Sequence, residues 1–132
     1  FAPAILDYKF YEWFGKEQEP SLYMQKALKI LKNKKNLIPS AVHIDETCRV
    51  QYVSKNKYQN FWKIIKEFKI KTGIPMLLNT SFNRHGISTI SSPKQAIEHL
   101  LEGCMDALYI EKYKITFKNN RKKTKIEAML YQ

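Results

Sequence analysis

The chain of 132 residues has room for one compact domain, and its 44% hydrophobic and 27% charged residues exclude a wholly disordered protein. Its 23 Lys and Arg outnumber 12 Asp and Glu, and the net charge of +11 favours anionic partners or an acidic neighbouring domain, although a lysine-rich solvated surface gives the same balance. No apolar run approaches the roughly 20 residues of a membrane span, and the first residues lack a signal-peptide pattern. We therefore expect a cytoplasmic protein without membrane contact.

The first 53 residues have weak periodic signals. Apolar spacing predicts a short helix within residues 6–14, where Leu6, Phe10, Trp13 and Phe14 recur. Residues 21–32 fit either a helix or a strand that starts near Leu22. Residues 49–53 alternate in polarity as a half-buried strand does.

The middle of the chain predicts a helix followed by a strand. Helical spacing over residues 56–71 gives an apolar stripe of Tyr58, Phe61, Ile64, Ile65 and Phe68. Gly73 can end this helix in the left-handed conformation. The continuous apolar run of residues 76–78 is typical of a strand buried on both faces.

A second helix and strand follow a polar loop. Ser92, Pro93 and Gln95 form a capping box that predicts a helix start. Gly103 ends the helix, and residues 107–110 form another apolar strand. The expected buried stripe of this helix consists of Ala96, Ile97, Leu100, Leu101 and Cys104, with His99 at its boundary.

The alternation of strands and helices predicts an α/β fold, a mixed twisted open sheet with crossover helices packed on it. Ligands of such sheets bind beyond the carboxyl ends of the strands. The polar residues that follow the strand at 76–78 are therefore candidates for a site, with an ordinary polar loop as the alternative: Asn79, Thr80, Ser81, Asn83 and Gly86.

Arg49 is a second candidate, because an arginine on a strand offers a fixed fork for phosphate or carboxylate. The alternative is a structural ion pair with Asp45 or Glu46. Cys48 lies beside this arginine, which could lower the pKa of its thiol. His43, His85 and His99 lack ligand-like spacing with one another or with the cysteines, so we expect no metal site.

Three segments together resemble one family. Residues 43–51 read His-Ile-Asp-Glu-Thr-Cys-Arg-Val-Gln, residues 72–75 read Thr-Gly-Ile-Pro, and residues 78–83 read Leu-Asn-Thr-Ser-Phe-Asn. Their order and spacing resemble those of the O-carbamoyltransferases of the nodulation and antibiotic-biosynthesis type (NodU/CmcH). The opening Phe-Ala-Pro-Ala also looks like that family, so the resemblance runs from Phe1 to about Tyr113.

The resemblance implies part of a carboxyl-terminal, YrdC-like α/β domain over residues 1–118, followed by a basic tail at residues 119–132. Such a domain makes carbamoyl-adenylate from carbamoyl phosphate and ATP. An amino-terminal actin/Hsp70-like domain then passes the carbamoyl group to a hydroxyl of a sugar or secondary-metabolite acceptor. By resemblance, Arg49 and Ser81 are catalytic and ATP takes part as a substrate; we expect no metal in this fragment. The implied substrate-binding residues are Asn79, Thr80, Asn83, His43 and Thr47.

The chain departs from the family pattern at several points. Glu46 replaces a glycine, and Ile87-Ser88 replaces Glu-Pro. The family's Gly-Pro-Arg and Lys-rich site segments would precede Phe1, so we expect a piece of a longer enzyme that is inactive alone. The resemblance also favours a strand around residues 22–24.

The alternative function is a small basic α/β module that binds RNA. No RNA-binding motif of aromatic and basic residues is present, which makes nucleic acid an unfavoured partner. A domain without activity, kept for assembly, is a further alternative.

Overall fold

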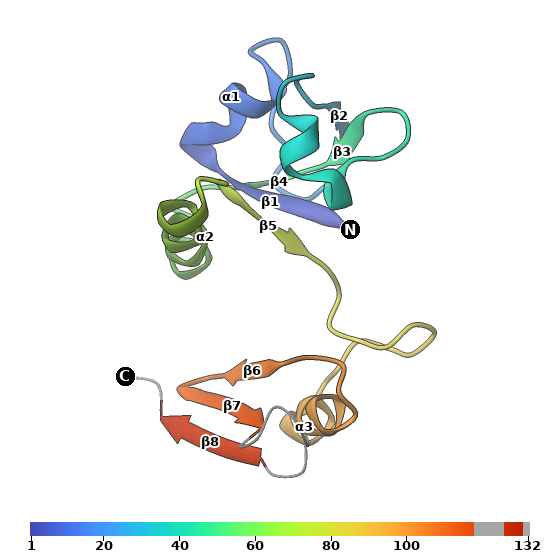
Figure 1. Ribbon diagram of the computed structural model, residues 1–132, viewed down its shortest axis with the longest axis vertical. Coiled ribbons are helices and arrows are strands. Elements are labelled where there is room, and N and C mark those ends of the chain that lie inside the picture. Colours follow the sequence, from blue (N-terminus) through green and yellow to red (C-terminus); the bar gives the residue numbers. More distant parts are fainter. Residues whose placement is uncertain (118–125, 131–132) are drawn as a thin grey trace. The chain divides into compact units, whose positions relative to one another are not determined.

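The computed structural model describes residues 1–117 and the backbone of residues 126–130. The chain divides into two compact units, residues 1–80 and residues 81–132, and each is described by itself (Figure 1). Residues 118–125 lie outside the described part, so the expected boundary after residue 118 stays a prediction. The strand at residues 126–130 pairs with the strand before it.

The first unit is built on a three-stranded sheet whose central strand is buried. The order is β4-β1-β5, in which β1 pairs parallel with β4 and antiparallel with β5. Every residue of β1 is buried, so the strand shows no polar–apolar alternation, and for that reason the sequence did not predict it. The bounds are β1 Ala2–Leu6, β4 Gln51–Val53 and β5 Met76–Asn79.

The strand expected at residues 49–53 is two strands in two sheets. β3 (Thr47–Arg49) pairs antiparallel with β2 (Ala27–Lys29), whereas β4 pairs with β1, and the chain changes sheet at the buried Val50. The strand expected around residues 22–24 is wrong. Those residues form a turn in which Met24 has a φ of 55°, and the strand lies further on, in β2.

Short helices and β2–β3 cover one face of the main sheet. The expected short helix is confirmed as α1, whereas Leu6 belongs to β1. Two further 3-10 turns, η2 and η3, lie between β2 and β3. Phe10, Trp13 and Phe14 of α1 pack with Ile5, Cys48 and Met76 in one apolar cluster. The bounds are η1 Asp7–Lys9, α1 Phe10–Phe14, η2 Lys35–Leu37 and η3 Pro39–Ala41.

The predicted long helix is confirmed as α2 (Gln59–Thr72) and covers the other face of the sheet. Gly73 ends it with a φ of 80°, as expected. The predicted stripe was partly wrong: Trp62 and Ile65 are buried against Ala4 and Leu6, with Tyr58 and Phe61 beside them, whereas Ile64 and Phe68 are exposed. A three-stranded sheet is narrow, so it covers only one row of helix side chains.

The second unit packs α3 (Pro93–Leu101) on the sheet β6-β7-β8. The Ser92 hydroxyl accepts from the Gln95 N–H at 3.3 Å, which confirms the cap, but the Gln95 side chain accepts from the Ser91 N–H instead of the Ser92 N–H. Ala96 and Leu100 are buried as predicted. Leu101 and Cys104 are exposed, which corrects the predicted stripe. The strands are β6 Ala107–Ile110, β7 Tyr113–Phe117 and β8 Ile126–Leu130.

The fold is therefore mixed α/β, as expected, but the single open sheet is wrong. The described strands form three small sheets, and β5 and β6 belong to different ones. Each long helix packs on the sheet of its own unit rather than on a shared one. Among the described residues, no helix has the length and apolar character needed to cross a membrane.

Adjacent isoleucines of α2 give a matched test of this packing. Ile65 is 0% exposed and Ile64 is 58% exposed. We expect Ile65→Ala to lower the free energy of unfolding by about 2–5 kcal/mol and Ile64→Ala to change it by less than about 0.5 kcal/mol. Urea denaturation of both variants measures the difference. Equal losses would contradict the observed orientation of α2.

Candidate functional site

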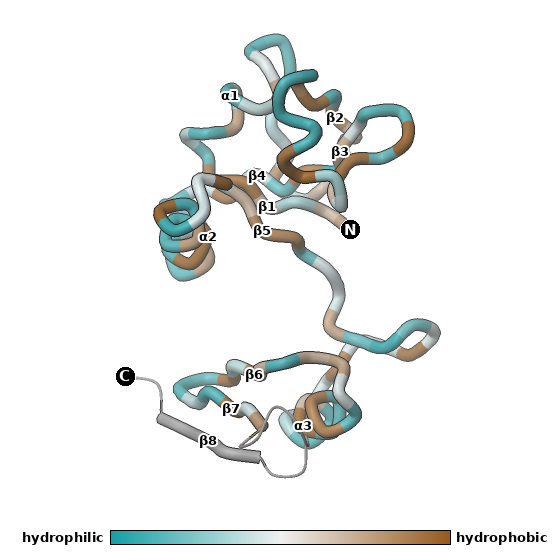
Figure 2. The backbone as a smooth tube through the Cα atoms, in the orientation of Figure 1, coloured by the Kyte–Doolittle hydropathy of each residue, from teal (hydrophilic) through white to brown (hydrophobic). Residues whose placement is uncertain are grey.

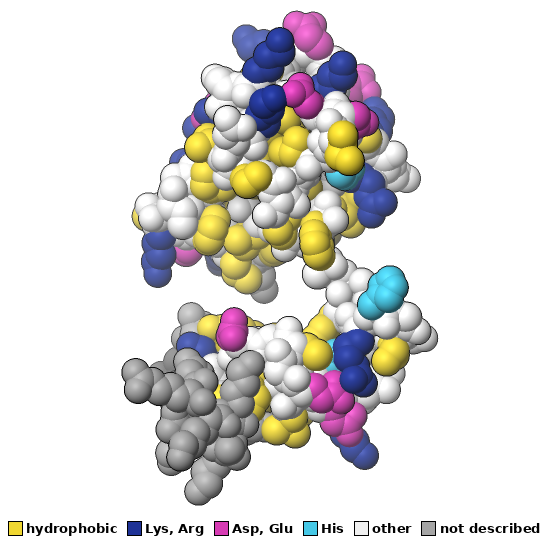
Figure 3. Space-filling view, turned by 45° about the vertical axis from the view of Figure 1, so that its right-hand side comes forward, with side chains coloured by type: hydrophobic (Ala, Val, Ile, Leu, Met, Phe, Trp, Pro, Cys, Tyr) yellow, Lys and Arg dark blue, Asp and Glu magenta, His cyan; other side chains and the backbone are white. Residues whose placement is uncertain are grey.

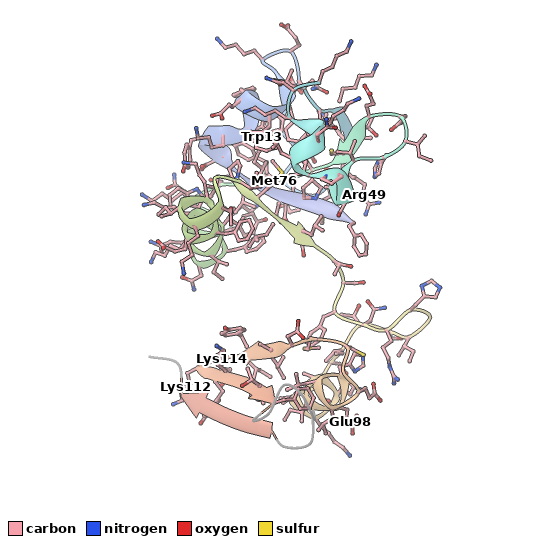
Figure 4. The ribbon with its side chains drawn as sticks, in the orientation of Figure 1. Trp13, Arg49, Met76, Glu98, Lys112 and Lys114 are labelled. Atoms are coloured by element: carbon pink, nitrogen blue, oxygen red, sulfur yellow. The ribbon has the colours of Figure 1, made fainter. Side chains whose placement is uncertain are left out.

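Arg49 ends β3 with its side chain exposed (Figure 4). The neighbouring carboxylates have other partners, because Asp45 accepts from Thr47 and Glu46 pairs with Lys35. Within the described residues, Arg49 has no carboxylate partner and no side-chain hydrogen bond. The alternative of a structural ion pair is therefore wrong. The guanidinium fork is open to an anion.

A tight turn before β3 holds His43 against Thr47. The His43 N–H donates to the Thr47 carbonyl at 2.8 Å. The Thr47 hydroxyl has one proton and gives it to Asp45 Oδ1 at 2.7 Å, so His43 Nδ1, 3.0 Å from Thr47 Oγ1, must be the donor of that contact. In the neutral ring, Nε2 of His43 is left as an acceptor. The hydrogen bonds from the Thr47 hydroxyl and N–H lower the pKa of Asp45.

Three of the predicted site residues share one side of β3. Thr47 and Arg49 are two positions apart, so their side chains point to the same face of the strand, and His43 bonds to Thr47 on that side. Cys48 points to the opposite face, into the core. The structure thus brings His43, Thr47 and Arg49 together as a polar patch on the surface of the first unit.

Glu46, where the resemblance leads us to expect a glycine, has a left-handed backbone with a φ of 64°. Glycine adopts this conformation at no steric cost, whereas other residues are strained there. Lys35 Nζ lies 2.5 Å from Glu46 Oε1, and this hydrogen bond lowers the pKa of the Glu46 carboxyl. Lys35 therefore balances the negative charge that Glu46 adds near Arg49.

Two substitutions isolate the backbone effect at this position. Glu46→Gly and Glu46→Ala both remove the ion pair with Lys35, but only glycine adopts a positive φ freely. We expect the glycine variant to be more stable than the alanine variant by about 1 kcal/mol in urea denaturation. At a right-handed position alanine would be the more stable of the two. An alanine variant of equal or higher stability would therefore contradict the left-handed turn.

Asn79 ends β5 and lies at the same end of the sheet as the start of β4. Its Nδ2 donates to Gln51 Oε1 at 2.8 Å, across β1. Because β5 runs antiparallel to β1, its carboxyl end meets the amino end of β4, two residues after Arg49. Thr80 follows and is exposed. The sequence assigned no role to Gln51, although it stands in the matching segment of residues 43–51.

Ser81 and Asn83 belong to the second unit. Asn83 Nδ2 donates to the carbonyls of Arg84 at 2.9 Å and Ile87 at 2.8 Å, which closes the loop around Gly86. The bond from the Asn83 side chain uses only the backbone carbonyl of residue 87, so an isoleucine at this position does not disturb it. The Ser81 side chain is exposed. That Ser81 and Arg49 share one cleft stays a prediction, because they lie in different units.

Other ionisable residues of the second unit hold its loop to α3. Arg84 pairs with Glu102 at 3.0 Å, and the ring of Phe82 packs edge-on against His99. His99 is buried, whereas the sequence led us to expect it at the boundary of the buried stripe, and its Nδ1 lies 3.1 Å from the Gln95 carbonyl. Among the described residues, no three His, Cys, Asp or Glu side chains are grouped as a metal site requires.

The two cysteines lie in environments opposite to those expected from the sequence: Cys48 is buried and Cys104 is exposed. Cys48 is fully buried, and burial, with a smaller contribution from Asp45, raises its pKa to about 11 rather than lowering it. Cys104, expected in the core, is exposed. A nucleophilic role for Cys48 is therefore excluded on physical grounds, because the reactive thiolate is scarce near neutral pH.

A thiol reagent should distinguish these cysteines. We expect Ellman's reagent at pH 7.5 to modify Cys104 in the folded chain and to modify Cys48 only after denaturation. Mass spectrometry of the labelled peptides identifies the site, and Cys104→Ser serves as the control that should abolish fast labelling. Rapid modification of Cys48 in the folded Cys104→Ser variant would contradict its burial.

The family model described as Carbamoyltransferase C-terminus matches residues 1–116. The chain belongs to this family. The match includes the turn with His43, the strand with Arg49 and the loop with Ser81 and Asn83. The resemblance drawn from the sequence motifs is therefore confirmed.

Relatives place this carbamoyltransferase segment within much longer proteins. The nodulation protein NolNO of Sinorhizobium fredii is 34% identical over 119 residues, which are 87% of this chain and 17% of that protein. The nodulation protein NolO of Bradyrhizobium diazoefficiens is 33% identical over 114 residues, 83% of this chain and 20% of that protein. An uncharacterised protein of Methanocaldococcus jannaschii is 34% identical over 113 residues, which are 86% of this chain and 18% of that protein. The chain spans about a fifth of the length of these relatives.

Proposed function

We propose that the chain is the part of an O-carbamoyltransferase that binds the phosphates of carbamoyl phosphate and ATP, from which carbamoyl-adenylate forms. The observation that supports this most is the exposed Arg49, whose guanidinium has no carboxylate partner among the described residues. An unpaired arginine fork fits the paired oxygens of a phosphate. Family membership supplies the reaction type.

The residues around Arg49 fit supporting roles in substrate binding. Thr47 fixes the ring of His43 through Nδ1, which leaves Nε2 as an acceptor at the edge of the patch. The Asn79 amide is oriented by Gln51, and Thr80 follows at the same end of the sheet. In this proposal Ser81 and Arg49 both bind the phosphates of the substrates. The hydrogen bonds of Asn83 hold the loop that follows Ser81.

The rest of the reaction belongs to segments outside this chain. The chain spans about a fifth of the length of its relatives. In this proposal, the remaining part of the longer enzyme binds the hydroxyl acceptor and carries out the transfer step, and it contains an actin/Hsp70-like domain. The YrdC-like character of this segment is part of the same proposal. ATP and carbamoyl phosphate are cytoplasmic metabolites, which makes the cytoplasm the proposed location.

Nucleic acid is less well supported as a partner than small phosphate esters. Stacking of bases needs free aromatic faces on a basic surface. Tyr8 and Tyr23 are exposed, but lysine ammonium groups already lie over both rings, Lys69 at 5.6 Å and Lys57 at 4.7 Å. These contacts occupy one face of each of these two rings and two of the positive charges that RNA would need.

The decisive residue of this proposal is Arg49. In a full-length carbamoyltransferase that carries this segment, we expect Arg49→Ala to lower carbamoyl-phosphate-dependent exchange of pyrophosphate into ATP by about 10- to 150-fold, the loss of one charge-assisted contact. Arg49→Lys keeps the charge but not the fork and should remain impaired. The 132-residue chain alone should show no exchange.

Lys63→Ala is the matched control, because it removes one exposed positive charge on α2. Its exchange rate should equal that of the unchanged enzyme. Undiminished exchange by Arg49→Ala would remove Arg49 from the phosphate site. Exchange by the isolated chain would show that the site is complete within these residues.

A further inference from the structure

Within the first unit, the edge strand β5 of the main sheet pairs with β1 on one side and with no described strand on the other. The Leu6 N–H donates to the Pro75 carbonyl at 3.1 Å, which fixes this pair as a hydrogen-bonded one. Bonded and non-bonded pairs alternate in antiparallel strands, so Leu77 and Asn79 also bond to β1, and the backbone groups of Met76 and Leu78 point away from it. Among the described residues, none bonds to those outward groups.

The opposite edge of the sheet is partly covered. The Tyr52 N–H of β4 donates to the Ser21 carbonyl at 2.8 Å, so the chain itself lies along that edge. Free edge strands normally carry a lysine, a proline or a bulge that prevents pairing with another strand. β5 reads Met-Leu-Leu-Asn and has none of these. Most of β5 is coloured as hydrophobic in Figure 2.

An apolar hollow of about 350 Å³ follows this edge. Consecutive strand residues point to opposite faces, so a hollow lined by all of residues 76–78 lies along the edge rather than on one face. Its other walls are Pro3, residues 37–41, Phe68 and Ile74, none of them charged. Figure 3 shows hydrophobic side chains gathered on one face of the first unit.

Leu78 stands in this wall with 51% of its surface exposed, and Leu37 and Phe68 are exposed beside it. An open row of backbone donors and acceptors next to an apolar hollow is the combination that binds an added β-strand. Backbone bonds hold such a strand, and its alternate side chains fill the hollow. A helix would leave the outward backbone groups of β5 unpaired, because its own backbone groups already bond to one another. A charged strand would place unpaired charges in the apolar hollow.

We infer that β5 is the docking edge for an extended, apolar strand supplied by the remaining four-fifths of the longer carbamoyltransferase, which adds to the sheet beyond β5. The relatives contain that much polypeptide outside the matching segment. The sheet of order β4-β1-β5 thereby gains a fourth strand next to β5. This inference rests on family membership and on the open edge, and it does not depend on the role of Arg49.

The test uses the 132-residue chain and, as the probe, S. fredii NolNO from which the 119 matching residues are deleted. We expect the two to bind in isothermal titration calorimetry. Hydrogen exchange at the Met76 and Leu78 amides should slow by about tenfold or more on binding. Leu78→Lys buries an unpaired ammonium in the hollow and should weaken binding by at least about tenfold.

Ile64→Lys is the matched control, because Ile64 is also apolar and is 58% exposed, against 51% for Leu78, but does not line the hollow. Its binding should match that of the unchanged chain. If the shortened NolNO does not fold, exchange is measured in a hybrid NolNO that carries this chain in place of its own segment, where the same two amides should be protected. Fast exchange of both amides in the complex or hybrid, or dimers of the chain joined through β5, would overturn the inference.

Discussion

The first unit depends on the complete burial of β1. A strand that is covered on both faces needs a layer on each side, and α2 supplies one while α1 and the β2–β3 pair supply the other. Ala4 leaves room for the ring of Trp62 on the α2 side, and Ile5 fills the opposite cluster. Asp7 then ties the end of β1 to this helix, since it accepts from the Lys55 N–H and from Trp62 Nε1, each at 2.9 Å.

The position of the candidate site follows from the two directions in which β1 pairs. Its parallel partner β4 begins with Gln51, and its antiparallel partner β5 ends with Asn79. Those two side chains therefore meet, and the strand that carries Arg49 leads directly into β4. Were β5 parallel to β1, Asn79 and Thr80 would lie at the far end of the sheet from Arg49.

Local sequence signals predicted the two long helices well. The strand arrangement that they did not predict depends on pairing between distant residues. The helical period, Gly73 and the Ser92 cap act within a few residues, so α2 and α3 were predicted to within about three residues at each end. The division of residues 49–53 between two sheets depends on partners far along the chain. Arg49 was a candidate from its residue type, but only the structure shows that no carboxylate of the described residues pairs with it. Gln51 carried no chemical signal beyond its place in the family motif.

The pairing of β1 also has a kinetic consequence. Every pair between β1 and β5 joins residues more than 70 positions apart, and those between β1 and β4 are more than 40 apart. Closing such long loops is entropically unfavourable, so these contacts form late in folding. Until synthesis has passed Asn79, the last residue of β5, the apolar β1 segment lacks one of the two strands that it pairs with. During synthesis, this apolar segment therefore stays exposed and prone to aggregation until its partner strands have been made.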